Sequence, residues 1–341
     1  YDFNDEDLRP YFPVEQVMDG LFGLATRLFG ISITPRDSVF YEPGSSNSNG
    51  KVEVWDPEVS FYELNDVESG EQLGSFYADW HPRETKRNGA WMHFLETGLP
   101  PREGRERKPH LGLICGNMTK PVGDKPALLT HSEVQTIFHE FGHLLHHVLA
   151  GRHPWVRFSG VATEWDFVEA PSQMLEEWAW DHGVLAGFAV DADGTPIPEA
   201  LVDRMRAAEE FGKGYYARTQ MYYAAVSYRF HAELPDDLTA RSRELSDRYA
   251  VWGQVPDTHF HCGFGHLEGY GSGYYTYMWS LVIAKDLFSA FDAGDLFAPE
   301  VATRYRDTVL AAGGSRDAAD LVEEFLGRPY DNRAFTAWLE S

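Results

Sequence analysis

Two histidines four residues apart, with a glutamate between them, are the residues of this 341-residue chain whose spacing most directly indicates chemistry: His139, Glu140 and His143. On a helix, side chains four positions apart project from one side, one turn apart. Two neutral imidazoles placed in this way can bind one zinc ion. Glu140, about 100° further round the helix, can then reach a metal-bound water without being a ligand. The pattern therefore predicts a hydrolytic zinc site with Glu140 as general base.

The surrounding residues predict the helix that this site needs. Thr130 followed by Glu133 is a capping-box pattern, which places a helix start just before the motif. Apolar residues then recur at helical spacing, at Val134, Ile137, Phe138, Phe141, Leu145 and Val148. A helix with two buried, hydrogen-bonded histidines and no metal is the alternative interpretation. His146 and His147 prolong the run, but three ligands along one straight helix cannot converge on one ion, so we interpret both as flanking residues.

A catalytic zinc needs a third protein ligand and an open position for water. The downstream candidates are Glu164, Glu169, Glu176, Glu177, His261 and His266. A residue on the next helix is favoured, and we expect that helix to begin near Asp166, with Asp166 and Glu169 as a second capping box, and to continue through Trp178. Pro171 falls in its first turn or kinks it. On a regular helix Glu169 and Glu176 share a face, so that one would ligate and the other would orient a ligand histidine. The residues alone leave this choice open.

A second segment of chemical interest is the glycine-rich stretch Gly263–Gly273, with five glycines in eleven residues. Such a run predicts irregular, mobile chain. The helix expected after it carries Tyr274 and Tyr277 on one face. A phenol can donate a hydrogen bond to the oxyanion that develops when water attacks a peptide carbonyl. The stretch is therefore interpreted as a substrate-closing loop, and a flexible linker into the next helix is the alternative.

These segments resemble those of a known enzyme family. The run FHEFGHLLHH, followed by DFVEAPSQMLEEW at 166–178, is similar to the thimet oligopeptidase, oligopeptidase A and peptidyl-dipeptidase family of zinc metallopeptidases. The similarity extends over most of the chain, including FYADWHPR at 76–83 and NMTKP at 117–121. The glycine-rich stretch resembles the substrate loop of the same family.

The resemblance implies a role for individual residues. One Zn²⁺ per chain would be held by His139, His143 and Glu169, with Glu140 as the general base. Glu176 is then the residue that orients a ligand histidine from behind. The loop would supply His266, Tyr274 and Tyr277 as catalytic residues, and Tyr270 and His266 as substrate-binding residues.

The pattern of elements predicts a mainly α chain with a small antiparallel β-sheet, and the resemblance implies a zincin-like metallopeptidase catalytic domain. The expected helices, besides the two around the zinc site, are 12–29, 201–210, 215–232, 237–251, 274–291 and 317–325, and the expected strands are 52–55, 59–64, 74–80 and 110–118. We expect one catalytic domain over residues 1–341, with the zinc helices in 131–180 and the substrate loop in 261–277. Family members carry a long N-terminal helical region that walls a deep channel. That region is absent from this chain, so a missing N-terminal region or a partner chain is expected to complete the channel.

Composition excludes some classes of partner. The 53 acidic against 29 basic residues give a formal charge of −24, which disfavours nucleic acid. No run of 18 apolar residues is present, so we expect no membrane span. The two cysteines, Cys115 and Cys262, form no disulfide framework, which favours a reducing, cytoplasmic location.

The resulting prediction is a zinc-dependent endopeptidase, an oligopeptidase that hydrolyses internal bonds of short, unstructured peptides. A zinc-activated water would attack the carbonyl and Glu140 would take its proton. One alternative is a peptidyl-dipeptidase, which releases C-terminal dipeptides with the same residues. The other is a zinc-stabilised, non-catalytic binding scaffold. Glu140 argues against the scaffold, because a purely structural zinc site has no use for a base.

Overall fold

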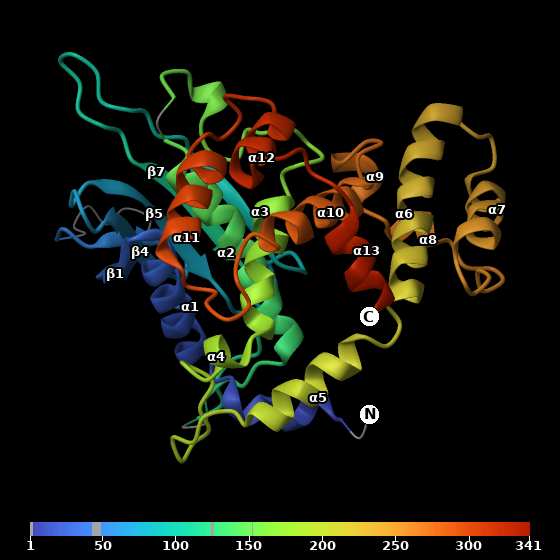
Figure 1. The fold of residues 1–341 in the computed structure, drawn as a ribbon, viewed down its shortest axis with the longest axis horizontal. Helices are drawn as coiled ribbons and strands as arrows, with labels where there is room; N and C mark the ends of the chain where they lie inside the picture. Colours follow the sequence, from blue (N-terminus) through green and yellow to red (C-terminus); the bar gives the residue numbers. More distant parts are fainter. Residues whose placement is uncertain (1–2, 43–48, 124–125, 152) are drawn as a thin grey trace.

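The computed structural model describes residues 3–42, 49–123, 126–151 and 153–341. Within these ranges the strands are β1 Ile31–Arg36, β2 Ser38–Phe40, β3 Val52–Val54, β4 Ser60–Asp66, β5 Gln72–Asp79, β6 Trp91–Glu96 and β7 His110–Cys115. The main sheet has five strands in the order β1-β4-β5-β7-β6, and β2 pairs separately with β3 (Figure 1). Strand β6 is therefore an edge of the main sheet.

The main sheet is mixed rather than antiparallel. Strands β1, β4 and β5 pair antiparallel, as do β6 and β7, but β5 and β7 run parallel. The prediction of an antiparallel sheet is wrong for that pair. After β5 the chain first forms the edge strand β6, and β7 then returns between β6 and β5, which makes it parallel to β5. The segment predicted as a strand at 52–55 exists as β3, but it pairs parallel with β2 outside the main sheet.

Most of the chain is helical. The helices are α1 Val14–Phe29, α2 His131–Leu149, α3 Ala170–Glu176, α4 His182–Leu185, α5 Glu199–Glu209, α6 Lys213–Glu233, α7 Leu238–Tyr249, α8 Phe260–Gly263, α9 His266–Gly269, α10 Thr276–Phe288, α11 Pro299–Tyr305, α12 Ala318–Leu326 and α13 Arg333–Glu340. The six further helices expected from the sequence are confirmed as α1, α5, α6, α7, α10 and α12, with ends shifted by at most three residues. The short helix α9 lies inside the glycine-rich stretch, where irregular chain was expected. None of the described helices is both long and apolar enough to cross a membrane.

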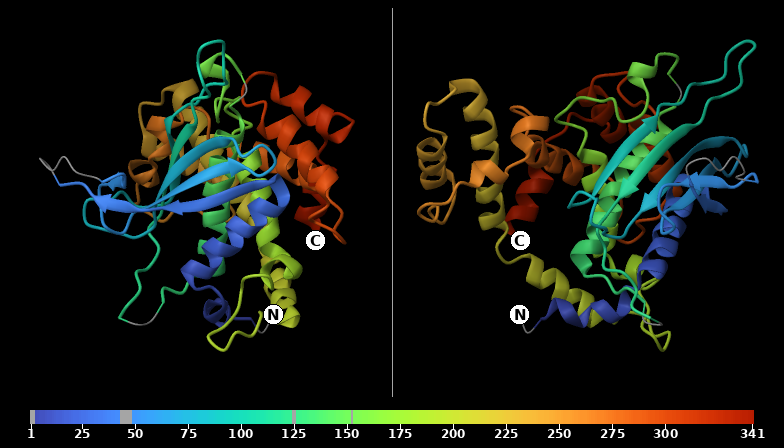
Figure 2. Two further views of the ribbon diagram at one scale, coloured as in Figure 1. Left: turned by 90° about the vertical axis from the view of Figure 1, so that its left-hand side faces the viewer. Right: turned by 180° about the vertical axis from the view of Figure 1, so that it is seen from behind.

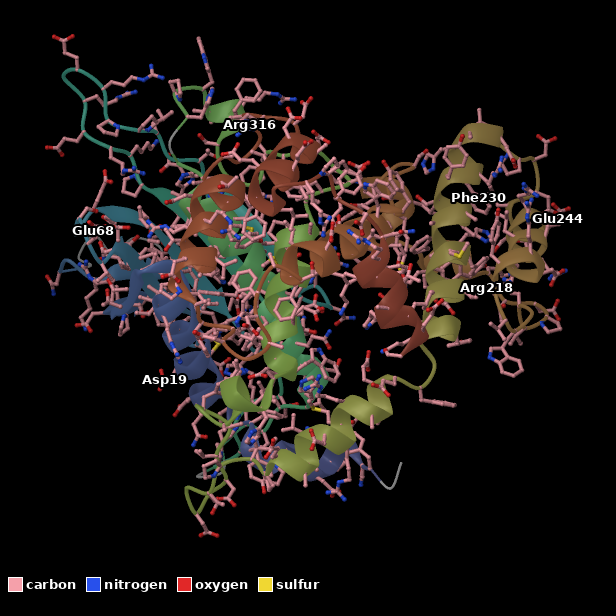
Figure 3. All side chains as sticks on the ribbon, viewed as in Figure 1. Asp19, Glu68, Arg218, Phe230, Glu244 and Arg316 are labelled. Atoms are coloured by element: carbon pink, nitrogen blue, oxygen red, sulfur yellow. The ribbon has the colours of Figure 1, made fainter. Side chains whose placement is uncertain are left out.

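Helices cover one face of the sheet, as the left view of Figure 2 shows. Helix α2 packs against β5, β6 and β7. Its predicted apolar stripe is buried there, and burial of each such side chain contributes about 1.5–3 kcal/mol. A second, smaller hydrophobic cluster lies between α6 and α7 and includes Val226, Phe230 and Leu245, of which Phe230 is labelled in Figure 3. The burial of the stripe fixes which side of α2 is left for the histidines.

Helices α2 and α3 are in contact through their main chains. A β-carbon at Gly142 in α2 would lie 2.6 Å from Cα of Ser172 and 3.1 Å from the carbonyl oxygen of Pro171. Only glycine permits this approach, because such distances are closer than carbon atoms tolerate. The residue just before α3 is Glu169, so the contact decides how near Glu169 comes to α2.

The predicted start of α3 near Asp166 is wrong. Residues 165–169 form turns, and the helix begins at Ala170 with Pro171 in its first turn. Proline suits that position, because its fixed φ matches the helix and its missing N–H is not needed there. Asp166 caps nothing, and its carboxylate instead accepts a hydrogen bond from the hydroxyl of Tyr275 at 2.8 Å.

We predict that Gly142→Ala lowers the free energy of unfolding by about 1–3 kcal/mol, since the added methyl group overpacks the α2–α3 contact. Gly23→Ala in α1 is the matched control. No atom lies within 4 Å of the β-carbon position there, so the same change should raise stability by about 0.5–1 kcal/mol. Urea unfolding measures both variants. Equal stability of Gly142→Ala and the parent would contradict the close approach.

Candidate active site

Helix α2 begins with the capping box that the sequence predicts. The main-chain N–H of Glu133 donates to Oγ1 of Thr130 at 3.1 Å, and the N–H of Thr130 donates to Oε2 of Glu133 at 2.8 Å. The helix then runs without interruption to Leu149. His139 and His143 are therefore held one turn apart on a helix that is fixed at its N-terminus and along its apolar face.

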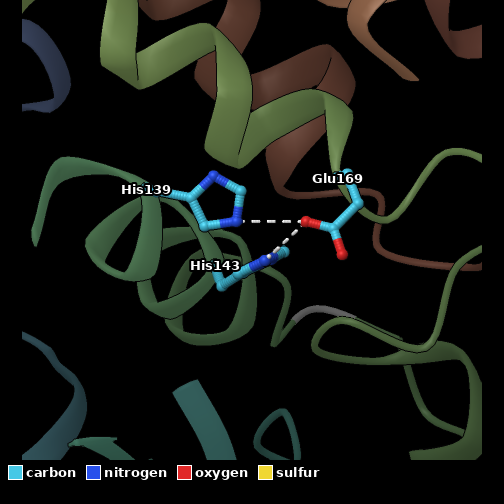
Figure 4. Close-up of side chains that lie close together, drawn as sticks. All are labelled: His139, His143 and Glu169. Carbon is cyan, nitrogen blue, oxygen red and sulfur yellow. Dashed lines mark ion pairs between the residues drawn. The ribbon is translucent and has the colours of Figure 1, made fainter. Parts of the chain in front are cut away.

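The structure brings His139, His143 and Glu169 together (Figure 4). Oε2 of Glu169 lies 3.2 Å from Nε2 of His139 and 3.0 Å from Nε2 of His143. The two imidazole rings are nearly perpendicular, with centroids 4.9 Å apart. Within the described ranges this is the group whose ligand atoms converge closely enough to hold a metal ion.

Glu176 lies behind His139, in the contact predicted for it. Its Oε1 is 2.6 Å from Nδ1 of His139, and its Oε2 accepts from Nε2 of Gln135 at 2.6 Å. A carboxylate at Nδ1 keeps the proton on that nitrogen and leaves the lone pair of Nε2 facing Glu169. Two imidazole Nε2 atoms and one carboxylate oxygen are the donors that zinc takes in three-ligand catalytic sites. The residues present therefore fit a zinc ion.

The charges of the site follow from burial and from these contacts. Burial opposes ionisation of Glu169, but His143 and His139 hold the pKa of its carboxyl far below the usual range. Burial would lower the pKa of His139, and Glu169 and Glu176 together raise it well above its ordinary value. Glu140 is 7% exposed, and burial raises the pKa of its carboxyl against the opposing effects of the histidines and of the main chain of Met92. The site gathers carboxylates around two imidazoles, which favours a cation.

Tyr270 and His266 of the glycine-rich stretch face Tyr277 of α10 beside this cluster. The hydroxyl of Tyr277 lies 3.3 Å from the hydroxyl of Tyr270 and 3.4 Å from Nε2 of His266. Burial and the charge of Glu169 raise the pKa of Tyr277, and burial also raises that of Tyr270. Both side chains are therefore neutral phenols near pH 7, able to donate hydrogen bonds.

Tyr274 has a different place. Its hydroxyl donates to Oε1 of Gln220 on α6 at 3.0 Å, and its side chain is buried. The rings of Tyr274 and Tyr277 touch, with centroids 5.0 Å apart, but their hydroxyls have different partners. Helix α10 begins at Thr276, so Tyr274 precedes the helix on which the sequence analysis placed both residues.

Other candidates for the third ligand lie elsewhere. Oε1 of Glu164 accepts from the N–H of Ala318 at 2.8 Å, and Oε1 of Glu177 pairs with Nζ of Lys285 at 2.5 Å. His261 belongs to the short helix α8 and is not in the cluster. The flanking histidines of α2 are fully buried, and His147 donates from Nε2 to the carbonyl oxygen of Glu96 at 3.1 Å.

Sequence reasoning did not single out the hydrogen bonds that tie the segment of Glu169 to that of Tyr277. Oγ1 of Thr276 donates to the carbonyl oxygen of Trp165, and Oγ of Ser280 donates to that of Asp166, both at 2.8 Å. Nε2 of Gln173 donates to the carbonyl oxygen of Tyr277 at 2.9 Å. Thr276 and Ser280 are fully buried. Their spacing of four in the largely apolar first part of α10 is the signal that could have pointed to them.

Comparison with known proteins places the chain. The sequence signature described as Peptidase family M3 matches residues 1–340. The chain belongs to peptidase family M3. Among curated M3 relatives, oligopeptidase A of Escherichia coli (strain K12) is 38% identical over 339 residues, which cover 96% of this chain and 47% of that protein. Dipeptidyl carboxypeptidase of Salmonella typhimurium is 33% identical over 338 residues, with 96% and 47% covered.

The fold is also found among solved structures. A crystal structure described as an oligoendopeptidase F aligns with a TM-score of 0.54 at 16% identity, covering 77% of this chain and 42% of that one. This likeness supports the mostly helical fold with its mixed sheet. The chain spans about half the length of the curated M3 relatives it matches.

We predict that Glu169→Gln weakens zinc binding by more than about 100-fold, since it removes a charged ligand, and that Glu176→Gln weakens it about tenfold through the orientation of His139. Glu164→Gln is the control and should bind zinc like the parent. Competition with a chromophoric chelator measures all three affinities. Zinc affinity that falls in Glu164→Gln and stays unchanged in Glu169→Gln would assign the third ligand to Glu164.

Proposed function

We propose that this chain is the catalytic part of a zinc-dependent oligopeptidase that cleaves internal bonds of short, unstructured peptides. The observation that carries the proposal is the position of Glu140, buried beside the His139, His143 and Glu169 cluster without belonging to it. A purely structural metal site gives no role to such a carboxylate. Membership of family M3 and the similarity to proteins named oligopeptidase A support the same reaction class.

The residues divide the chemistry between them. A bound zinc ion would supply a Lewis acid that polarises a carbonyl and makes water more acidic. Glu140 takes a proton from the attacking water and passes it to the leaving amine. Burial favours the first transfer, because it raises the pKa of the Glu140 carboxyl and so makes Glu140 a stronger base, which holds the proton until the leaving amine takes it.

The tyrosines near the cluster have separate roles in this mechanism. Tyr277 donates a hydrogen bond to the developing oxyanion, and His266, 3.4 Å from the Tyr277 hydroxyl, helps to hold it in place. Tyr270 binds the substrate when the loop closes. Tyr274 contributes by anchoring the loop to α6 through Gln220, a role in positioning rather than in contact with the reacting atoms.

The free edge of β6 favours an extended peptide as substrate. This strand is the last of the main sheet, and the main chain of Met92 within it contacts Glu140. An extended peptide can pair with the unoccupied side of an edge strand through main-chain hydrogen bonds. Its carbonyls would then run past Glu140, and a folded protein could not present its chain in this way.

Three expectations from the sequence concern the organisation and location of the protein. The single-domain organisation over 1–341, the completion of a channel by an N-terminal region or partner chain, and the cytoplasmic location stay predictions. Release of C-terminal dipeptides is the second candidate, favoured by the similarity to a dipeptidyl carboxypeptidase. It needs only a barrier at one end of the substrate cleft.

We predict that Glu140→Gln keeps zinc and fold but loses peptide hydrolysis by at least about 10²–10⁴-fold, since it removes the base. Mass spectrometry of a ten-residue peptide measures the reaction, with Glu164→Gln as the control that keeps activity. The products also separate the two candidates, because an oligopeptidase cuts internally and a peptidyl-dipeptidase releases dipeptides stepwise from the C-terminus. Near-normal turnover by Glu140→Gln would sink the proposed mechanism.

We predict that Tyr277→Phe lowers kcat by about 10²–10³-fold with KM and zinc content nearly unchanged, because its hydroxyl acts in the transition state. Tyr274→Phe is the matched variant. It should lose about 1 kcal/mol of stability with the Gln220 hydrogen bond and keep most of kcat. Steady-state kinetics and thermal unfolding distinguish the two, and the reverse pattern would make Tyr274 the catalytic phenol.

A further inference from the structure

The loop between β5 and β6 carries three cations, and two of them, Arg83 and Lys86, form ion pairs with one aspartate. Asp79, 2% exposed, accepts from Nη1 and Nη2 of Arg83 at 2.8 and 2.6 Å. Nζ of Lys86 donates to Oδ1 of Asp79 at 2.9 Å and to the carbonyl oxygens of Asp79 and of His81 in the loop. Asp79 is thereby saturated, and the loop is fixed to the end of β5.

The third cation, Arg87, differs from the other two in its surroundings. Within the described residues its guanidinium has no carboxylate partner, and the side chain is exposed. The main chain around it is nevertheless held, because Nδ2 of Asn117 donates to the carbonyl oxygens of Arg87 at 2.9 Å and of Gly89 at 2.8 Å. The guanidinium lies over the ring of Trp91, 5.5 Å from its centroid. The guanidinium of Arg87 is therefore exposed, while hydrogen bonds hold its main chain and the ring of Trp91 supports its side chain.

Arg87 lies next to the edge strand whose main chain contacts Glu140. Trp91, on which the guanidinium rests, opens the edge strand β6 and directly precedes Met92, the contact of Glu140. The charge of Arg87 also acts on two residues of the glycine-rich stretch, His266 and Tyr270. Burial raises the pKa of Tyr270, and the charge of Arg87 is the last of the effects that oppose this. Burial lowers the pKa of His266, the charge of Glu169 opposes that shift, and the charge of Arg87 adds to it.

We propose that Arg87 binds a carboxylate of the peptide substrate, which makes it a specificity-determining residue for peptides that carry a negative charge near the scissile bond. The inference rests on the proposed peptidase function. A guanidinium offers a planar fork of donors that matches a carboxylate, and stacking on Trp91 orients that fork. The rest of the site and the chain as a whole are acidic, so Arg87 offsets a repulsion that acidic peptides otherwise meet.

Two groups of a peptide have this chemistry: the terminal carboxylate and the side chain of aspartate or glutamate. A series of four peptides of one length separates them. Two carry glutamate and two carry glutamine next to the cleaved bond, and one of each pair has an amidated C-terminus. Parent, Arg87→Gln and the control Arg243→Gln are assayed with each peptide at one ionic strength, because exposed ion pairs are screened by salt. Arg243 is an exposed arginine on α7, away from the zinc helices (Figure 1).

The expected result is a roughly tenfold loss of kcat/KM in Arg87→Gln for peptides with the recognised carboxylate and less than about a twofold loss for the neutral, amidated peptide. A loss that follows glutamate identifies the side chain as the partner, and a loss that follows the free C-terminus identifies the chain end. Arg243→Gln should match the parent with all four.

An equal loss with all four peptides would overturn the proposal, because Arg87 would then support the loop and not the substrate. No loss with any peptide would also overturn it. Fluorescence anisotropy with labelled versions of the same peptides provides a readout that does not need turnover. If the parent cleaves none of them, the proposed function fails, while weaker binding of the acidic peptides to Arg87→Gln would still support the carboxylate contact and unchanged binding would refute it.

Discussion

The close approach of α2 and α3 at Gly142 is the contact on which the site depends. It lets the backbone at Pro171 and Ser172 lie against the zinc helix, and so the turn before α3 delivers Glu169 within 3.2 Å of both histidines. A side chain at position 142 would separate the helices by more than the tolerance of a metal site, where ligand distances vary by only about 0.2 Å. The packing of α3 against α2 therefore also brings the three candidate metal ligands together.

Buried hydrogen bonds connect this contact to Tyr277, the residue proposed to stabilise the oxyanion. Thr276 and Ser280 tie α10 to the turn that precedes Glu169, and Gln173 on α3 ties it to Tyr277. Each bond pairs a side-chain donor with a main-chain carbonyl oxygen of the other segment, and a typical bond of this kind contributes about 0.5–1.5 kcal/mol. The candidate zinc ligands and Tyr277 come from segments more than 100 residues apart, and these bonds fix their relative position more tightly than apolar packing alone.

What the sequence predicted well is local in origin. The spacing of His139 and His143, the capping box at Thr130 and the apolar stripe all act within α2, and each is as predicted. What it missed depends on distant partners. The start of α3 follows from Pro171 and from the contact with α2, and the parallel pairing of β5 with β7 follows from the order in which strands join the sheet. The partner of the Tyr274 hydroxyl is Gln220, 54 residues away, which no local pattern reveals.

The central claim is that His139, His143 and Glu169 hold the metal and that Glu140 stands beside it as the base. Anomalous X-ray diffraction from zinc-soaked crystals at the zinc absorption edge tests this most directly. The account predicts one strong peak per chain, about 2.0–2.2 Å from Nε2 of both histidines and from a carboxylate oxygen of Glu169, with the Glu140 carboxylate outside bonding distance. A peak bonded to Glu140, or one placed away from Glu169, would contradict it.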